Sequence, residues 1–320
     1  AMKVLGSPAT PEETAAEAAI RDVPDWQGRQ VAYAPLCADV VSPVHRGVES
    51  AVWHVAPDGM SDGVLKVLRD DMAGQFDATA AVEGAVRASD TGVGPRVLWT
   101  DAARGAIAME YLGAGWRTAT LADLQDCGVM AGVLDRARAF QAALLEQAFD
   151  VFAEIRALAA RLEAAGIALP ADGWWLLEQA GLIEAAVVAS GRDAAPCRND
   201  GVASNVMVAD DGTVRLLDYD RAGMNDPAYD LAVILTEACA FESERAPWVE
   251  HWAGRADPAL LNRTLAYGAA DDLNWALWGV LNAETSPRVH VEFRKYAEWR
   301  LLRCRQTLGD PHFEERLRKL

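Results

Sequence analysis

The sequence from Pro196 to Asp230 reads PCRNDGVASNVMVADDGTVRLLDYDRAGMNDPAYD, and it decides the fold that we predict for the whole chain. Residues 206–208 are apolar, and the apolar pattern resumes at Val214, Leu216 and Leu217. The Asp211-Gly212 pair between these runs is typical of a tight hairpin turn. This part of the chain therefore predicts an antiparallel β-hairpin that is followed by a loop and a helix.

Acidic and amide side chains flank the predicted hairpin. Asp200 and Asn205 precede it, and Asp218 ends its second strand. Phosphoryl transfer needs a carboxylate near the attacking hydroxyl group and oxygen ligands that hold magnesium on the phosphates. Asp200 would be the base, and Asn205 and Asp218 would bind magnesium. A surface hairpin with turn-forming Asp and Asn residues is the alternative interpretation, but the combined pattern favours a kinase-like site.

The same stretch resembles the choline/ethanolamine kinase family, within the larger aminoglycoside-phosphotransferase and protein-kinase-like group. That family carries Cys-His-Asn-Asp, an Asn five residues later, Asp-Phe/Tyr-Glu, a loop with Asn, and an Asp followed seven residues later by Glu. The matching residues here are Cys197-Arg198-Asn199-Asp200, Asn205, Asp218-Tyr219-Asp220, Asn225, Asp230 and Glu237. Arg198 stands where the family usually has a His that braces the catalytic loop. This replacement bears on the geometry of the loop and not on its chemistry. Asp220 stands where the family's third acid is commonly Glu, and it keeps the negative charge. We therefore include Asp220 in the predicted metal site.

The composition narrows the possible partners. The 320 residues are 51% hydrophobic and carry a formal net charge of −17. Nucleic acid is not expected as a partner because phosphate binding needs clustered Lys and Arg, whereas a small cationic substrate matches the sign of the charge. The five cysteines are widely spaced without a zinc or CxxC pattern, which predicts reduced thiols in a cytoplasmic protein. We expect no membrane span and no signal peptide, and a homodimer is left open.

The first third of the chain predicts a helix and then an antiparallel sheet. Thr10-Pro11-Glu12-Glu13 is a capping box, which predicts a helix over Pro11–Arg21 on the outside of the first lobe. From about Val31 onward the apolar runs predict a five-stranded sheet. The polar turn before Ser50 would cover the nucleotide phosphates. It only loosely resembles the family's Gly-Gly-x-(Ser/Thr)-Asn turn, with Ser50 in the place of the Asn.

Lys66 lies in an apolar predicted strand, where a charge needs a partner. We expect its ammonium to bind the α- and β-phosphates and to pair with Glu83 in the helical stretch 76–89. The alternatives are a lysine on the exposed face of the strand and a solvated glutamate. The main chain from Glu110 to Leu112 would hydrogen-bond the adenine edge. We predict a lobe boundary just after Leu112.

The remainder of the chain predicts helices. Apolar residues recur at three and four positions through 116–190, and another helix is expected over 229–241. We therefore predict an N-terminal helical extension (1–30), a nucleotide-binding lobe (31–112) and a catalytic and substrate-binding lobe (113–320).

Two tryptophans near the end of the chain carry a second signal. Trp275 and Trp278 are three residues apart on one side of a predicted helix, and Tyr296 follows. Paired tryptophans commonly belong to a core. However, aromatic faces also bind quaternary ammonium groups through cation–π attraction. Within the family resemblance, Trp275, Trp278 and Tyr296 line a choline pocket, and Glu237 faces the cationic head of the substrate.

These observations together predict a two-lobed α+β, protein-kinase-like fold, with a small antiparallel N-lobe and a larger helical C-lobe. The expected activity is ATP- and magnesium-dependent phosphorylation of the hydroxyl of an amino alcohol, with choline or ethanolamine as the first candidates. An aminoglycoside or other small-molecule phosphotransferase of the same group is the first alternative. A pseudokinase that only binds its ligands is the second.

Overall fold

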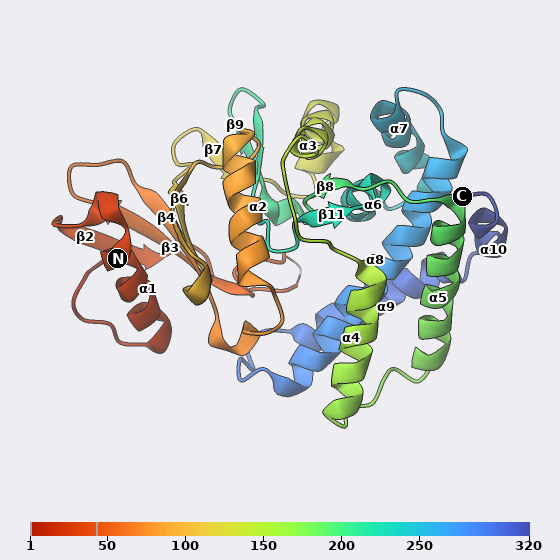
Figure 1. Cartoon of the computed structure of the whole chain (residues 1–320), viewed down its shortest axis with the longest axis horizontal. Coiled ribbons are helices and arrows are strands. Elements are labelled where there is room, and N and C mark those ends of the chain that lie inside the picture. Colours follow the sequence, from red (N-terminus) through yellow and green to blue (C-terminus); the bar gives the residue numbers. More distant parts are fainter. Residues whose placement is uncertain (1, 43) are drawn as a thin grey trace. The chain divides into compact units, whose positions relative to one another are not determined.

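The structure is a computed structural model that describes residues 2–42 and 44–320. The chain forms two compact units (Figure 1). The first contains the N-terminal residues, Val44–Gln147 and Ser204–Gly223, and the second consists chiefly of Ala148–Ala203 and Met224–Leu320. The predicted lobe boundary after Leu112 does not coincide with this division, because residues 113–147 and the later hairpin belong to the first unit.

The first unit is built on a six-stranded antiparallel sheet with the strand order β1-β2-β3-β4-β6-β5. The strands are β1 (Lys3–Val4), β2 (Val31–Pro35), β3 (Ser50–Pro57), β4 (Gly63–Leu68), β5 (Val97–Asp101) and β6 (Ala106–Glu110). Our prediction of five strands was wrong by one. The extra strand is β1, which has two residues and is too short to show an alternating pattern, and it is formed by pairing with β2.

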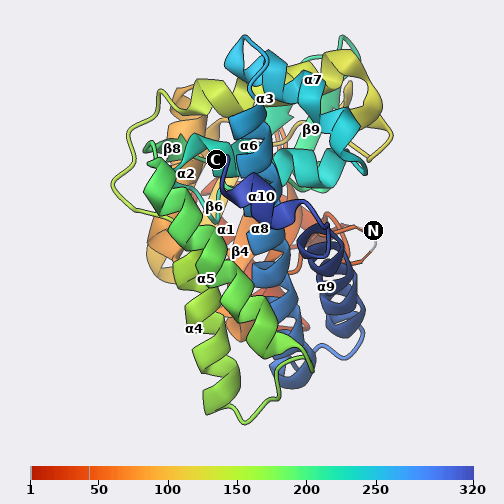
Figure 2. The same ribbon diagram turned by 90° about the vertical axis from the view of Figure 1, so that its right-hand side faces the viewer.

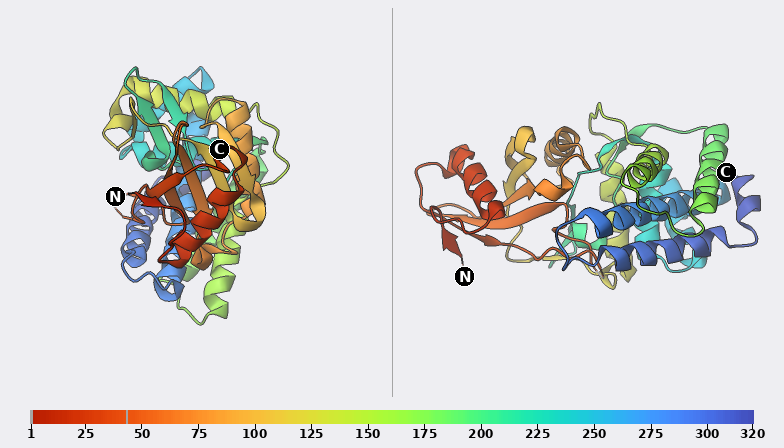
Figure 3. Two further views of the ribbon diagram at one scale, coloured as in Figure 1. Left: turned by 90° about the vertical axis from the view of Figure 1, so that its left-hand side faces the viewer. Right: turned by 90° about the horizontal axis from the view of Figure 1, so that it is seen from below.

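One face of this sheet packs against helix α1 (Pro11–Asp22), which lies across the strands in Figure 3 (left). The predicted cap is confirmed, because the Thr10 side chain accepts a hydrogen bond from the Glu13 N–H at 3.1 Å. Since side chains alternate across a strand, alternate residues meet α1. The resulting core contains Ala16, Ala19, Ile20, Tyr33, Trp53, Val55, Leu65 and Val67. The intervening positions, Lys66 among them, therefore belong to the opposite face.

The rest of the first unit consists of α2 (Ala78–Asp90), α3 (Cys127–Phe140) and a second sheet. This sheet has the order β10-β9-β7, with β7 (Trp116–Thr118), β9 (Val206–Ala209) and β10 (Val214–Leu216). The predicted hairpin is thus confirmed as β9 and β10. The prediction of helices over residues 116–190 was wrong at the start of that range, because β7 pairs with β9. Residues 141–150 also form no α-helix.

The second unit is mainly helical, and its long helices run side by side in Figure 2. The helices of this unit are α4 (Val151–Ala164), α5 (Gly173–Ser190), α6 (Pro227–Ala238), α7 (Glu242–Ala253), α8 (Pro258–Thr285), α9 (Phe293–Leu308) and α10 (Phe313–Leu317). Strands β8 (Ala195–Cys197) and β11 (Gly223–Asn225) pair as a small sheet. The helix predicted over 229–241 begins two residues earlier, because Asp226 caps it and Pro227 occupies its first turn.

Helix α8 is the central element of the second unit. It contacts α4, α5, α6 and α9, and its middle, residues 266–282, is buried. Asp271 and Asp272 lie within this buried stretch and pair with Arg300 and Arg303 of α9. No helix formed by the described residues is both long and apolar enough to cross a membrane.

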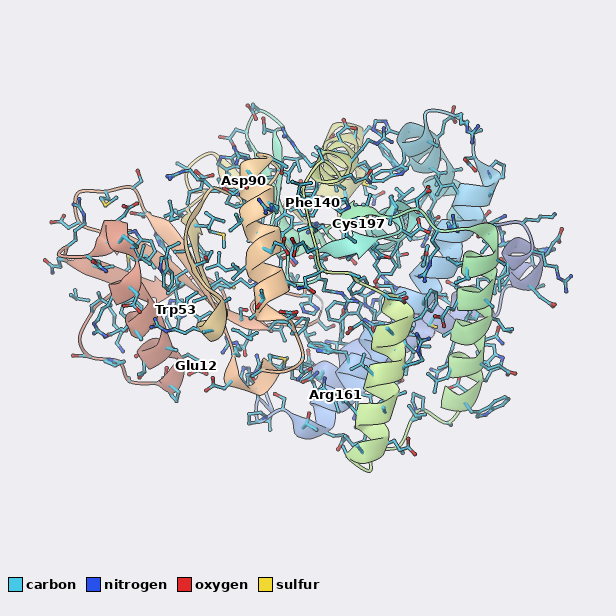
Figure 4. All side chains as sticks on the ribbon, viewed as in Figure 1. Glu12, Trp53, Asp90, Phe140, Arg161 and Cys197 are labelled. Carbon is cyan, nitrogen blue, oxygen red and sulfur yellow. The ribbon has the colours of Figure 1, made fainter. Side chains whose placement is uncertain are left out.

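Short 3-10 helices connect several of these elements: η1 (Pro24–Trp26), η2 (Asp70–Met72), η3 (Ala102–Arg104), η4 (Asp123–Gln125) and η5 (Ala203–Asn205). Figure 4 shows the side chains of both units, with Trp53 on β3, Phe140 at the end of α3 and Cys197 on β8.

Candidate active site

The first unit contains a cavity of about 350 Å3 on the face of the large sheet opposite to α1. Apolar side chains form one part of its wall: Leu36, Val52, Val64, Met109, Leu112, Met207 and Leu217. Polar side chains form the other part: Arg46, Glu49, Ser50, Lys66, Asn205 and Asp218. A cavity with an apolar part and a charged part suits a ligand with an aromatic base and a phosphate chain. The cavity brings together six of the residues predicted from sequence: Ser50, Lys66, Glu110, Leu112, Asn205 and Asp218.

The main chain beside the apolar wall has unused hydrogen-bonding capacity. The N–H of Glu110 donates to Arg96, and the N–H of Tyr111 donates to Asp62. Leu112, the next residue, makes no main-chain hydrogen bond to any other described residue. A base edge placed against Leu112 could therefore use its N–H and C=O groups.

Lys66 forms the centre of an ion cluster at the polar end of the cavity. Its Nζ donates to Asp218 Oδ1 and to Asp220 Oδ1, each at 2.6 Å. Burial alone would lower the pKa of Lys66, but the two carboxylates raise it above its usual range. Lys66 therefore stays charged at neutral pH and supplies a fixed cation to the cavity.

The two carboxylates beside Lys66 differ. Burial would raise the pKa of Asp218, but the charge and hydrogen bond of Lys66 hold it below its usual range. Burial and the Asp218 charge raise the pKa of Asp220 to about 7. Asp218 also has a left-handed backbone, with φ of 61°, which is unusual for a residue other than glycine. The site thus contains two acids that compete for one lysine.

The predicted ion pair between Lys66 and Glu83 is absent from the described structure. Glu83 lies on α2 and forms neither a hydrogen bond nor an ion pair with the described residues. The reason is the rotational phase of the helix: Ala78, Ala81 and Val82 of α2 line a small space beside Lys66. Successive residues of a helix are about 100° apart, so Glu83 belongs to a different face.

The predicted magnesium ligands fit a hard divalent cation by their chemistry. Asn205 and Asp218 lie side by side, with Nδ2 of the amide 3.4 Å from Oδ2 of the carboxylate. Two neighbouring acids that share one lysine leave negative charge that a further cation would neutralise. The described residues hold no cluster of three or more His, Cys, Asp or Glu side chains suited to a metal. If magnesium binds here, the Asn205 amide oxygen and the neighbouring carboxylates would be its protein ligands.

Sequence reasoning missed two buried residues at the edge of this cavity. His45 Nε2 lies 2.6 Å from Glu49 Oε1, and both side chains are buried. The Ser204 hydroxyl donates to the His45 carbonyl oxygen, which ties this loop to the residue before Asn205. No helical periodicity signalled this pair, because residues 45–49 form no α-helix.

The second unit holds the predicted catalytic residue, Asp200, in the loop after β8. Its Oδ1 accepts the Val202 N–H at 2.7 Å, and its Oδ2 accepts Arg198 Nη1 at 3.3 Å. Arg198 is buried, and its guanidinium also donates to the Asp200 carbonyl oxygen. The arginine that replaces the family's histidine therefore braces this loop directly, and it holds the carboxylate that we predicted to be the base.

Helix α6 fixes the position of this loop. Asp230 Oδ1 accepts the Asn199 N–H at 2.8 Å, and Glu237 Oε1 accepts the Ala203 N–H at 3.3 Å. Burial raises the pKa of Asp230 to about 6, although Arg198 opposes the rise. A Cβ atom on Gly201 would lie 2.1 Å from the Val233 carbonyl oxygen, so only glycine permits this approach. Glu237, predicted to face the substrate, thus also supports the loop.

The predicted aromatic residues meet in the second unit. The ring centroids of Trp275 and Trp278 are 5.2 Å apart, and Tyr296 lies 6.3 Å from Trp275 and 6.1 Å from Trp278. All three are buried. Of the three, Trp275 lines the same small space as Asp200 and Glu237, and that space measures only about 10 Å3.

Arg300 is a further residue of this cluster that sequence reasoning missed. Its guanidinium carbon lies 5.2 Å from the Tyr296 ring centre and 6.0 Å from that of Trp275. Its Nε donates to the Tyr296 hydroxyl at 3.0 Å, and its Nη1 donates to Asp272 at 2.9 Å. The aromatic group therefore already contacts a cation from its own chain. The spacing of four between Tyr296 and Arg300 on α9 was the available signal.

Comparisons with known proteins identify the family and the fold of the chain. The model of the phosphotransferase enzyme family (APH) matches residues 40–273, and the chain belongs to this family. A search of curated proteins found no match.

Solved structures show the same fold. A choline/ethanolamine kinase family protein from Mesorhizobium loti is 24% identical, with a TM-score of 0.79 over 96% of this chain and 98% of that one. LicA, the choline kinase of Streptococcus pneumoniae, in complex with AMP is 19% identical, with a TM-score of 0.72 over 88% and 93%. A mutant of aminoglycoside phosphotransferase APH(4)-Ia with AMP-PNP and hygromycin B is 17% identical, with a TM-score of 0.57 over 84% and 93%. The fold is thus the two-lobed α+β fold of the protein-kinase-like group.

Proposed function

We propose that the chain is an ATP- and magnesium-dependent kinase that phosphorylates the hydroxyl group of a small amino alcohol, with choline or ethanolamine as the first candidates. Membership of the phosphotransferase family and likeness to small-molecule kinases support the general activity. The observation that carries the choice of substrate is Trp275, whose ring lines the same space as the Asp200 and Glu237 carboxylates. An aromatic face beside two acids suits an ammonium group.

In this proposal the cavity of the first unit binds ATP. Its apolar wall would hold the adenine ring, with the main chain of Leu112 at the base edge. Lys66 would neutralise charge on the phosphates, because two carboxylates keep it protonated. Asn205 and Asp218 would hold magnesium, with Asp220 beside them, and magnesium would neutralise charge that develops on the phosphate oxygens.

Asp200 would act on the alcohol. Its carboxylate accepts the hydroxyl proton while the substrate oxygen forms a bond to the γ-phosphorus. The bond from that phosphorus to the β–γ bridging oxygen breaks, and ADP leaves. Arg198 and the Val202 N–H keep the carboxylate in place. The products are ADP and the phosphate ester of the alcohol.

One observation favours a second candidate substrate class within the same reaction. Arg300 already lies against the faces of Tyr296 and Trp275, so a second cation at those faces would meet a like charge. An alcohol that presents oxygen atoms to Arg300, such as a sugar or an amino-acid alcohol, would instead gain a charge-assisted hydrogen bond.

The test is ADP release with ATP and magnesium in the presence of choline, ethanolamine, amino-acid alcohols and a panel of aminoglycosides. Asp200→Asn should abolish stimulated release and leave ATP binding largely intact, while Asp193→Asn, the same change at an exposed position, should have no effect. Unchanged turnover in Asp200→Asn would remove Asp200 from the reaction. Release with another alcohol and none with choline would keep the kinase and reject the choline assignment. Absence of any magnesium-dependent turnover would favour the ligand-binding alternative.

A further inference from the structure

Lys66 pairs with two aspartates that follow β10 and not with Glu83, the partner that the sequence predicts. Its Nζ donates to Asp218 and Asp220 at 2.6 Å each, whereas Glu83 bonds to no residue of the described chain. We propose that Asp220 positions the Lys66 ammonium in place of a helix glutamate, and that Asp220 is therefore a positioning residue and not a third magnesium ligand. This role of Lys66 toward phosphates rests on the proposed function.

The surface of α2 beside Lys66 carries no acidic side chain. Ala78, Ala81 and Val82 of α2 line the small space next to the lysine. Asp220, which follows β10 in the chain, also lines this space. Lys66 itself is only 13% exposed, and Asp220 is 11% exposed. A buried ammonium needs an acidic partner, and small apolar residues on α2 cannot supply one. Asp220 fills that need.

Packing fixes the segment that carries Asp220. A Cβ atom on Gly84 would lie 2.6 Å from Ala222 Cβ and 3.0 Å from Tyr219 Cβ, so α2 closely approaches this segment. The Tyr219 ring packs on Phe140 with centroids 5.1 Å apart, and its hydroxyl donates to a main-chain carbonyl at 3.2 Å. Because Tyr219 is anchored in this way, its neighbour Asp220 has a defined position from which its carboxylate reaches Lys66.

The two acids have different surroundings, which separates their roles. Asp218 Oδ2 faces the Asn205 amide at 3.4 Å while its Oδ1 accepts from Lys66. Asp218 therefore has one oxygen directed to the second predicted metal ligand. Asp220 uses its Oδ1 for Lys66 and forms no hydrogen bond to Asn205. Asp220 therefore has Lys66 as its hydrogen-bond donor and Asp218 as its neighbouring acid, without a direct contact to the amide ligand.

The first test measures the reactivity of Lys66 in the full chain without nucleotide. An N-hydroxysuccinimide ester acylates free amines, and Lys66 is compared by peptide mass spectrometry with the other lysines, Lys3, Lys295 and Lys319, as internal references. Loss of one charged hydrogen bond in Asp220→Asn should raise the acylation rate of Lys66 about tenfold. Asp58→Asn, the same change in an exposed turn, should leave the rate unchanged.

This measurement needs no turnover, so it stays informative if the chain phosphorylates none of the alcohols. An unchanged Lys66 rate in Asp220→Asn would overturn the proposal, as would an increase of equal size in Glu83→Gln. Asp220→Glu, which restores an acid, should return the rate toward that of the parent. Adding Val82→Glu to Asp220→Asn should do the same, because Val82 faces the space beside Lys66. Circular dichroism of each variant verifies that the chain is folded.

The second test uses turnover with the best alcohol. Asp220→Asn should raise the KM for ATP about tenfold without changing the magnesium concentration that gives half-maximal rate. Asp218→Asn should change that magnesium concentration. A magnesium requirement that rises in Asp220→Asn as it does in Asp218→Asn would identify Asp220 as a metal ligand and reject the positioning role.

Discussion

Replacing Asp230 with asparagine tests how the buried carboxylate on α6 affects the pH dependence of stability. Asp230 is fully buried, and its Oδ1 accepts the Asn199 N–H, while Oδ2 has no hydrogen-bond partner in the described chain. Burial raises its pKa from 3.8 to about 6. The charged groups that face it are Arg198, which opposes the rise, and Asp200, which adds to it.

The sign and size of the effect follow from this pKa. Between pH 4 and 6 the folded chain holds a proton on Asp230 that the unfolded chain has released. The contribution of Asp230 is therefore fully present below about pH 4 and is lost as the pH rises through about 6. A rise in pKa from 3.8 to about 6 corresponds to about 3 kcal/mol of unfolding free energy at neutral pH. Asparagine cannot ionise, and it keeps an oxygen for the Asn199 N–H, so the variant should lack this loss.

The assay is urea unfolding of the parent and of Asp230→Asn at several pH values from 4 to 7. Between pH 4 and pH 7 the unfolding free energy of the variant should rise by about 2 kcal/mol relative to that of the parent, because the rest of the effect lies below pH 4. Asp193→Asn, an exposed control in the same unit, should give a difference that does not change with pH. A constant difference for Asp230→Asn as well would refute the argument that burial keeps this carboxyl protonated.

Three further predictions concern the loop and the aromatic residues. Gly201→Ala should lower kcat about 100-fold, because its Cβ would meet the Val233 carbonyl at 2.1 Å and displace Asp200; parent-like turnover would refute this close approach. Arg198→His should reduce kcat more than it raises the KM for the alcohol, since Arg198 contacts the Asp200 carboxylate, and a change in KM alone would contradict that role. If choline is the substrate, Trp275→Ala should raise the KM for choline about 10- to 30-fold, the loss expected from a desolvated cation–π contact of about 2 kcal/mol. Trp275→Phe keeps an aromatic ring and should raise this KM less. Equal effects of the two changes would place Trp275 in the core.

Sequence patterns predict secondary structure correctly where they involve residues close together in the chain. The Thr10 cap and the β9–β10 hairpin are confirmed in the structure. Each depends on residues within a few positions of one another, such as a capping side chain or an Asp-Gly turn. The short strands β1 and β7 were not predicted, because each is formed by pairing with a partner distant in sequence.

The candidate site also combines features that local sequence patterns predict with contacts that only the folded chain determines. Motif spacing selects Asn205 and Asp218, and a charge within an apolar strand selects Lys66. The structure places all three around one cavity of the first unit. The partner of Lys66 could not be read from spacing. Asp220 lies 154 residues away in sequence, and the choice between it and Glu83 depends on the rotation of α2 about its axis and on the close approach at Gly84.

The aromatic cluster was also only half determined by the sequence. The spacing of Trp275 and Trp278 predicts that they share a helix side, and the family resemblance adds Tyr296. Only the folded chain shows that Arg300 contacts these rings and that Trp275 alone of the three borders Asp200. A sequence thus determines local conformation and the residue types available for chemistry. Which charged side chains meet depends on packing between distant helices and strands, because burial, which makes pairing of charges necessary, is a property of the whole fold.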